Sequence, residues 1–116
     1  MAACSSSLRE VRARAPEFRF AGVPASGQFE VARCIRDVLD QAVGEGVLQE
    51  IERARDGMHV VGRPDESLSA AVFYDVAVRE GAVAARVAPS SVIPPEMLRG
   101  AIAVCVPAEP GAGAKP

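Results

Sequence analysis

Hydrophobic positions between residues 29 and 42 recur every three or four residues. Six apolar residues carry the pattern: Val31, Cys34, Ile35, Val38, Leu39 and Ala42. At about 100° per residue they fall in one stripe, which predicts an amphipathic helix that packs on a core. The next apolar set begins at Val47 in a different phase, after Gly44 and Gly46. Because glycine is common just past a helix end, we expect the helix to stop near Val43.

Two β-rich runs, residues 70–79 and 82–88, are separated by Glu80-Gly81. A turn of two residues at that point predicts a β-hairpin. Its register pairs apolar residues on one face: Val78 with Val83, Val76 with Ala85, and Tyr74 with Val87. On the other face it sets Asp75 opposite Arg86, a cross-strand pair of opposite charge. Alternation and turn length therefore favour the same hairpin.

The remaining pattern predicts shorter elements. Phe18-Arg19-Phe20 alternates between apolar and polar residues, which indicates a short edge strand within residues 17–23. The apolar spacing over residues 47–55 is helical and predicts a second, shorter helix. Further along, the sequence indicates a strand, one helical turn and a last strand: residues 58–61, 95–99 and 101–106. Together these elements predict an α+β domain whose antiparallel sheet of four to five strands packs on one main α-helix.

Chain length and the flanking residues set the domain organisation. With 116 residues the chain fits one domain, which we place at residues 17–106. Residues 1–16 are rich in serine and arginine, and we expect a flexible N-terminal segment with one helical turn. An organelle-targeting segment is the alternative for this stretch. Residues 107–116 are mostly proline, glycine and alanine, which predicts a disordered tail.

Net charge, hydropathy and cysteine content limit the kinds of partner, cofactor and cellular location that the sequence favours. The net charge of −2 argues against a nucleic-acid binder, and no apolar run approaches the ~18–20 residues of a membrane span. One histidine and three cysteines do not make the usual metal-ligand clusters, so we expect no metal and no cofactor. The apolar core of a secretory signal is also missing. We therefore expect a cytoplasmic protein whose thiols stay reduced.

The sequence contains no pattern typical of a catalytic site. Cys34, Cys105 and His59 are the ingredients for a thiol nucleophile and its base, but both cysteines lie in apolar patterns typical of buried residues. Asp37 and Asp40 each follow an arginine four residues earlier, which favours a solvated helix face. The glycine-rich stretches lack the Lys-Ser/Thr of a phosphate-binding loop. We therefore expect that the protein is not an enzyme.

Four stretches of the chain resemble the cystatin family: Gly22 ahead of the helix, residues 39–45 at the helix end, the string Met58-His59-Val60-Val61-Gly62, and Pro107. The string is similar to the family's Gln-x-Val-x-Gly loop, with methionine in place of glutamine. In cystatins these places form a wedge that plugs the active-site cleft of papain-like cysteine proteases. The resemblance implies a helix followed by antiparallel strands and a role as a protease inhibitor.

We expect a non-enzymatic protein-binding module or a small subunit of a larger assembly, whose partner is another protein or a second copy of this chain. The alternative is a cystatin-like inhibitor, and a less favoured one is a small-ligand or catalytic domain with a pocket between helix and sheet. The candidate partner-binding residues are Gly22, Met58, His59, Val60, Val61, Gly62 and Pro107. Residues 58–61 also fit a simpler interpretation, a strand whose Val60 faces the core.

Overall fold

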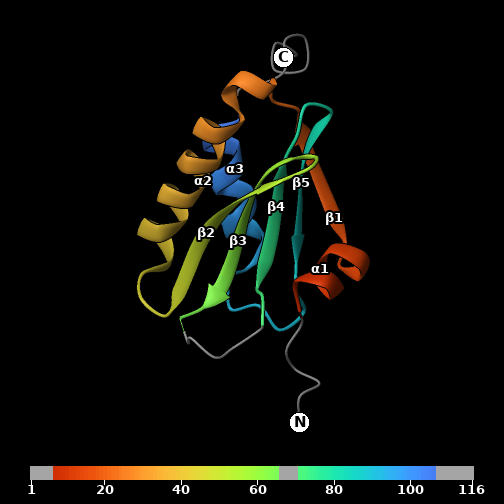
Figure 1. Cartoon of the computed structure of the whole chain (residues 1–116). Helices are drawn as coiled ribbons and strands as arrows, with labels where there is room; N and C mark the ends of the chain where they lie inside the picture. The colour runs from red at the N-terminus through yellow and green to blue at the C-terminus, as the bar shows by residue number, and fades with distance from the viewer. Residues whose placement is uncertain (1–6, 66–70, 107–116) are drawn as a thin grey trace, which may run out of the picture.

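A five-stranded antiparallel sheet with helices packed on it forms the framework of the chain (Figure 1). The computed structural model describes residues 7–65 and 71–106. Along these residues the elements are α1 (Leu8–Arg14), β1 (Glu17–Ala21), the short 3₁₀ helix η2 (Ala25–Gly27), α2 (Gln28–Val43), β2 (Val47–Ala54), β3 (Gly57–Pro64), β4 (Tyr74–Val78), β5 (Ala82–Val87) and α3 (Pro95–Cys105). The strand order is β1-β5-β4-β3-β2, so β1 and β2 form the two edges. The predicted α+β class is confirmed.

α2 is the long helix that the hydrophobic stripe predicted, and it ends at Val43 as expected. Ile35 and Leu39 are fully buried against the core. Gly44 follows with a φ of +79°, a left-handed conformation that favours glycine. Its N–H donates to the carbonyl of Asp40, which closes the last turn before the chain enters β2.

The hairpin of β4 and β5 has the predicted register. Tyr74, Val76 and Val78 pair with Val87, Ala85 and Val83, and Asp75 lies opposite Arg86. The strand β1 is likewise confirmed as an edge strand, and it pairs with β5. The predicted hairpin and the predicted edge strand therefore belong to one sheet.

The strand β2 corrects one prediction, the helix over residues 47–55. Val47–Ala54 is a strand that pairs with β3 along its whole length, with Ile51 opposite Val60. The spacing of apolar residues misled because Gln49, a polar residue, takes a buried position in the strand. Once Gln49 is counted, the inward-facing residues recur at every second position, as a strand requires.

The helix α3 corrects a second prediction. The sequence indicated one helical turn and then a strand within residues 95–106, but Pro95–Cys105 is one helix. Leu98 and Ile102 are fully buried at helical spacing, whereas Val104, which alternation placed on the same side as Ile102, is 72% exposed. The helix starts with proline, whose missing N–H is not needed in a first turn.

A disulfide between Cys34 and Cys105 joins α2 to α3. The two Cα atoms lie 5.7 Å apart, a usual separation for a disulfide. The bond corrects the expectation that these thiols are free. Sequence patterns could not pair residues 71 positions apart while the second one was assigned to a strand.

The helix α1 lies within residues 1–16, where the sequence predicted a flexible segment with one helical turn. Ser7 and Glu10 form a capping box at its start, in which each side chain binds the other residue's backbone N–H. Val11 is 1% exposed and packs in a small cluster with Val61 of β3. Regular structure therefore begins before β1. The predictions for residues 1–6 and 107–116 lie outside the described part of the chain.

The sheet has two unlike faces. The face covered by α2 and α3, here called the core face, carries the main apolar cluster, which includes Val60, Tyr74, Val76, Val78, Val83 and Ala85. The opposite face, here called the belt face, contacts α1 and carries a row of charged side chains. None of the helices in the described part of the chain has the length and hydrophobicity of a membrane span.

Candidate functional site

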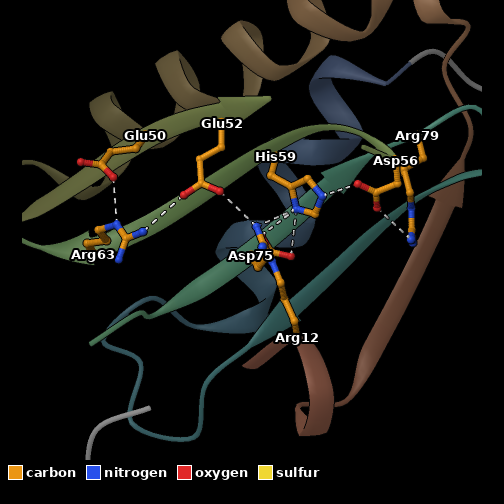
Figure 2. Close-up of polar contacts among 8 residues, drawn as sticks. All are labelled: Arg12, Glu50, Glu52, Asp56, His59, Arg63, Asp75 and Arg79. Carbon is orange, nitrogen blue, oxygen red and sulfur yellow. Dashed lines mark hydrogen bonds and ion pairs between the residues drawn. The ribbon is translucent and has the colours of Figure 1, made fainter. Parts of the chain in front are cut away.

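A connected row of charged side chains crosses the belt face of the sheet (Figure 2). Eight residues form this charged belt: Glu50, Arg63, Glu52, Arg12, Asp75, His59, Asp56 and Arg79. Each is joined to the next by an ion pair whose N···O distance lies between 2.8 and 3.4 Å. They come from α1, β2, β3, β4, the turn between β2 and β3, and the residue that follows β4.

Strand alternation brings the belt to one face. Glu50 and Glu52 are two positions apart on β2, and His59 and Arg63 are four apart on β3, so each pair projects from the same side of the sheet. The register sets Glu52 opposite His59. Tertiary structure therefore assembles charges that are distant in sequence, the widest bonded pair lying 63 positions apart.

His59 is the buried centre of the charged belt. Its Nδ1 lies 2.9 Å from Asp75 Oδ1, and its Nε2 lies 2.9 Å from Asp56 Oδ1. Ionised carboxylates only accept hydrogen bonds, so both ring nitrogens must donate, and the geometry fits an imidazolium cation. His59 and Asp75 are only 5% and 3% exposed. The sheet therefore holds a charged pair away from bulk water.

The pKa values follow from these contacts. Burial by itself lowers the pKa of His59, but the hydrogen bond and charge of Asp75, together with Asp56, outweigh it and raise the pKa above 6.5. For Asp56 burial acts to raise the pKa, and the bond and charge of His59 overcome it, with help from Arg79, so that the pKa is lowered. Both shifts favour the charged forms of the pair.

Arg12 ties α1 to the charged belt. Its Nη2 donates to Asp75 Oδ1 at 3.1 Å and to Glu52 Oε1 at 3.3 Å. Burial lowers the pKa of Arg12, but these two carboxylates raise it overall. The same nitrogen lies 3.1 Å from His59 Nδ1, so the two cations share Asp75 as their common acceptor. Docking of α1 therefore depends on a buried carboxylate as well as on Val11.

Neither ring nitrogen of His59 is open to a substrate, as acid–base catalysis by this histidine would need. Both nitrogens of His59 face carboxylates. Two surface hollows, of about 360 and 310 Å³, are lined by residues outside the belt. In residues 7–65 and 71–106, no group of three His, Cys, Asp or Glu side chains is placed to hold a metal ion. What the arrangement does hold in place is α1, through the bonds of Arg12 to Asp75 and Glu52.

A second polar group lies beneath α2. The Tyr74 hydroxyl donates to Gln49 Oε1 at 3.0 Å, and Gln49 Nε2 donates to Asp40 Oδ1 at 2.8 Å. Burial and the charge of Asp40 raise the pKa of Tyr74, so the phenol stays neutral. The arginine expected to pair with Asp40, Arg36, instead binds its neighbour Asp37. This group satisfies the buried amide of β2 and has no reactive member.

The candidate partner-binding residues do not form one surface. Five of them lie inside β3, and four of these are 0–6% exposed: Met58, His59, Val60 and Val61. Gly62 faces the ring of Tyr74, opposite the start of β4, whereas Gly22 lies against the carbonyl of Glu80, beyond the other end of β4. Pro107 lies outside the described residues. The structure thus places His59 in the charged belt and its neighbours in a central strand.

The sequence interpretation missed Arg12 and the bond between His59 and Asp75. Two signals were available for them. Ser7-x-x-Glu10 is the pattern of a capping box, which indicates α1, and a histidine within a buried strand requires hydrogen-bond partners. No protein-family model, no curated protein and no solved structure matches the chain. The function therefore has to be argued from the geometry of this chain.

Proposed function

We propose that the protein is a non-enzymatic protein-binding module or a small subunit of a larger assembly. The observation that supports this is the open sheet, in which the described residues leave both edge strands without a neighbouring strand on their outer sides (Figure 1). An edge strand presents backbone N–H and C=O groups that another chain can pair with. Strand addition is therefore a binding mode that this fold offers directly.

The edge β2 is well suited to strand addition. It has eight residues, Val47–Ala54, without proline or glycine, and proline is one of the residues that natural edges use to prevent pairing. Leu48 is 45% exposed on this strand. A long, regular edge with an exposed apolar side chain has the features of a docking edge.

The charged belt supports the same proposal because its charges are used within the chain. Its acids and bases are already paired with one another, and His59 is bonded on both sides. Such a face holds α1 and orders the sheet, but it offers no reactive group to a substrate. A rigid scaffold with free edges fits a binding function better than an enzyme.

Photo-crosslinking tests the proposal. A photo-crosslinking amino acid is introduced at Leu48 on β2 or at Arg19 on β1, and the chain is isolated from the cells that produce it. The matched control carries the same group at Gln41, an exposed position on α2. We expect a specific product at one edge or both, identified by mass spectrometry. If neither edge gives a product beyond that at Gln41, the proposal is wrong.

The alternative proposal, a cystatin-like inhibitor, draws on the sequence resemblance alone. An inhibitory wedge needs an exposed loop, and the string at residues 58–62 lies in the strand β3. We therefore prefer the binding module. The cytoplasmic location also stays a proposal, and the disulfide of Cys34 weighs against it because cytosolic thiols are mostly kept reduced. Alkylation of the protein from its native cells tests the location.

A further inference from the structure

We infer that the partner at the β1 edge is a second copy of this chain, paired antiparallel through β1 with Phe18 opposite the partner's Phe18. The inference rests on the proposed function and names one of its partners. The two sheets would join into one continuous sheet about a two-fold axis, an isologous interface in which each edge is its own complement. The edge strand β1 has five residues, Glu17–Ala21, and its Phe18 and Phe20 are partly buried on the core face.

Symmetry limits the registers that are possible. A two-fold axis perpendicular to the sheet keeps both core faces on the same side, so each residue lies opposite one of the same parity. Three registers pair three or more residues of β1: the one centred on Arg19 pairs all five, and those centred on Phe18 or Phe20 pair three. Centring on Arg19 sets two arginines against each other, and centring on Phe20 sets each Arg19 against the partner's Ala21. Centring on Phe18 sets Glu17 opposite the partner's Arg19 twice.

The charges of β1 therefore select the register centred on Phe18. Opposite charges directly across a strand pair attract, and like charges repel. Arg19 has a side chain that is 65% exposed, and its Nε lies 3.3 Å from Glu17 Oε1 of its own strand. On pairing, Arg19 exchanges this contact for the partner's Glu17. Arg79 and Arg86 remain within 3.7 and 3.5 Å of Glu17 Oε2, so the Glu17 carboxylate keeps its basic neighbours.

An apolar hollow of about 360 Å³ lies beside the start of β1 and points to the same register. Its lining includes Pro16, Val87, Ile93, Pro94 and Pro95. In the register centred on Phe18, the partner's Phe20 lies opposite Pro16 and on the core face, the side that carries Val87 and Ile93. The aromatic ring can therefore cover the hollow, and the symmetry fills both hollows at once.

The other edge does not complement itself. In the four antiparallel registers of β2 with a second β2 that pair five or more residues, Glu50 lies opposite Leu48, Glu50, Glu52 or Ala54 of the partner. None of these registers brings a base to Glu50, whose side chain is 47% exposed. Self-association is therefore expected at β1, and β2 stays available for a different protein.

Sedimentation equilibrium of the purified full chain tests the inference over about 1 µM to 1 mM, the range in which weak interfaces associate. We expect a dimer of the 12.1 kDa chain. Arg19→Glu should raise the dimer dissociation constant about tenfold, because two attractive cross-strand pairs become repulsive. Arg53→Glu on β2 is the matched control and should leave dimerisation unchanged.

A charge swap tests the register itself. Glu17→Arg alone should weaken the dimer, because the introduced arginine then lies opposite the partner's Arg19 in both cross-strand pairs. A mixture of the Arg19→Glu and Glu17→Arg chains should form a heterodimer, because both charged cross-strand pairs are then acidic against basic, whereas each homodimer sets like charges opposite each other. Circular dichroism verifies that each variant is folded.

A second pair of variants tests the apolar hollow. Phe20→Ala should weaken the dimer, whereas Phe29→Ala, at a half-exposed position on α2, should not.

The possible results separate the inference from the proposed function. A protein that stays monomeric throughout, or a dimer that neither Arg19→Glu nor Phe20→Ala weakens, overturns the inference. A charge-swapped mixture that forms no heterodimer overturns the register on which it depends. In each case a crosslinked partner protein at Leu48 would still support the proposed function. If the crosslinking group fails at Leu48 and at Arg19 as well, the proposed function fails too.

Discussion

Loss of the Cys34–Cys105 disulfide should lower the free energy of unfolding by about 4 kcal/mol. The bond closes a loop across a sequence separation of 71 residues. In the chain-entropy model, such a cross-link removes about 15 cal/mol/K from the unfolded chain, or about 4 kcal/mol at 25 °C. Small domains are stable by about 5–15 kcal/mol, so the loss is a large fraction of the total. Leu98 and Ile102 still hold α3 on the core, and we expect the reduced protein to fold.

Urea unfolding followed by circular dichroism measures this loss. The double variant Cys34→Ser/Cys105→Ser is compared with the wild type, and Cys4→Ser is the matched control that leaves the bond intact. Wild-type protein in a thiol reductant should reproduce the double variant. A difference below about 1 kcal/mol would refute the entropic argument. Alkylation of both thiols in protein purified without reductant would refute the bond itself.

His59 should make the stability depend on pH: its pKa is raised above 6.5, so its contribution is complete below about pH 6.5 and is lost as the pH rises through the raised value. Thermal unfolding should show this loss in the wild type, and an equal loss in His59→Gln would contradict it. Gly44→Ala should cost about 1 kcal/mol because φ is +79°, whereas Gly100→Ala, in open space within α3, should add about 0.4–1 kcal/mol; urea unfolding that ranks them the other way would oppose the helix boundaries. Papain should not be slowed by about 10 µM protein, because residues 58–61 lie inside the sheet; measurable inhibition would favour the cystatin interpretation.

The elements that could be predicted carry two local signals that agree. In α2 the hydrophobic stripe and Gly44 both place the helix end near Val43, and the structure ends it there. In the β4–β5 hairpin the alternation and the two-residue turn select the same register. Each of these signals acts within a few residues. Because the two signals in each element favour the same local structure, tertiary contacts did not override them.

The elements that failed had a single signal that long-range contacts overrode. Val47–Ala54 has helical apolar spacing, but Gln49 is buried there because Tyr74 and Asp40 satisfy its amide. That compensation comes from two other elements, and no local pattern reveals it. In α3, Gly100 and the alternating residues 101–106 favoured a turn followed by a strand. The segment is instead a helix whose buried residues pack in the main apolar cluster with α2 and the sheet. Burial partners, rather than propensity, decided both cases.

The charged belt shows why a correct register does not determine side-chain pairing. The sequence places Asp75 opposite Arg86, and the structure has that register. Yet the Asp75 carboxylate binds His59 at 2.9 Å and Arg12 at 3.1 Å, while Arg86 turns to Glu17 at 3.5 Å and to the carbonyl of Ala15. A two-strand register sets Cα neighbours, but a charged side chain pairs with the nearest opposite charge in three dimensions. With β3 paired beside β4 and α1 lying over the sheet, the two nearest bases to Asp75 come from outside its own hairpin.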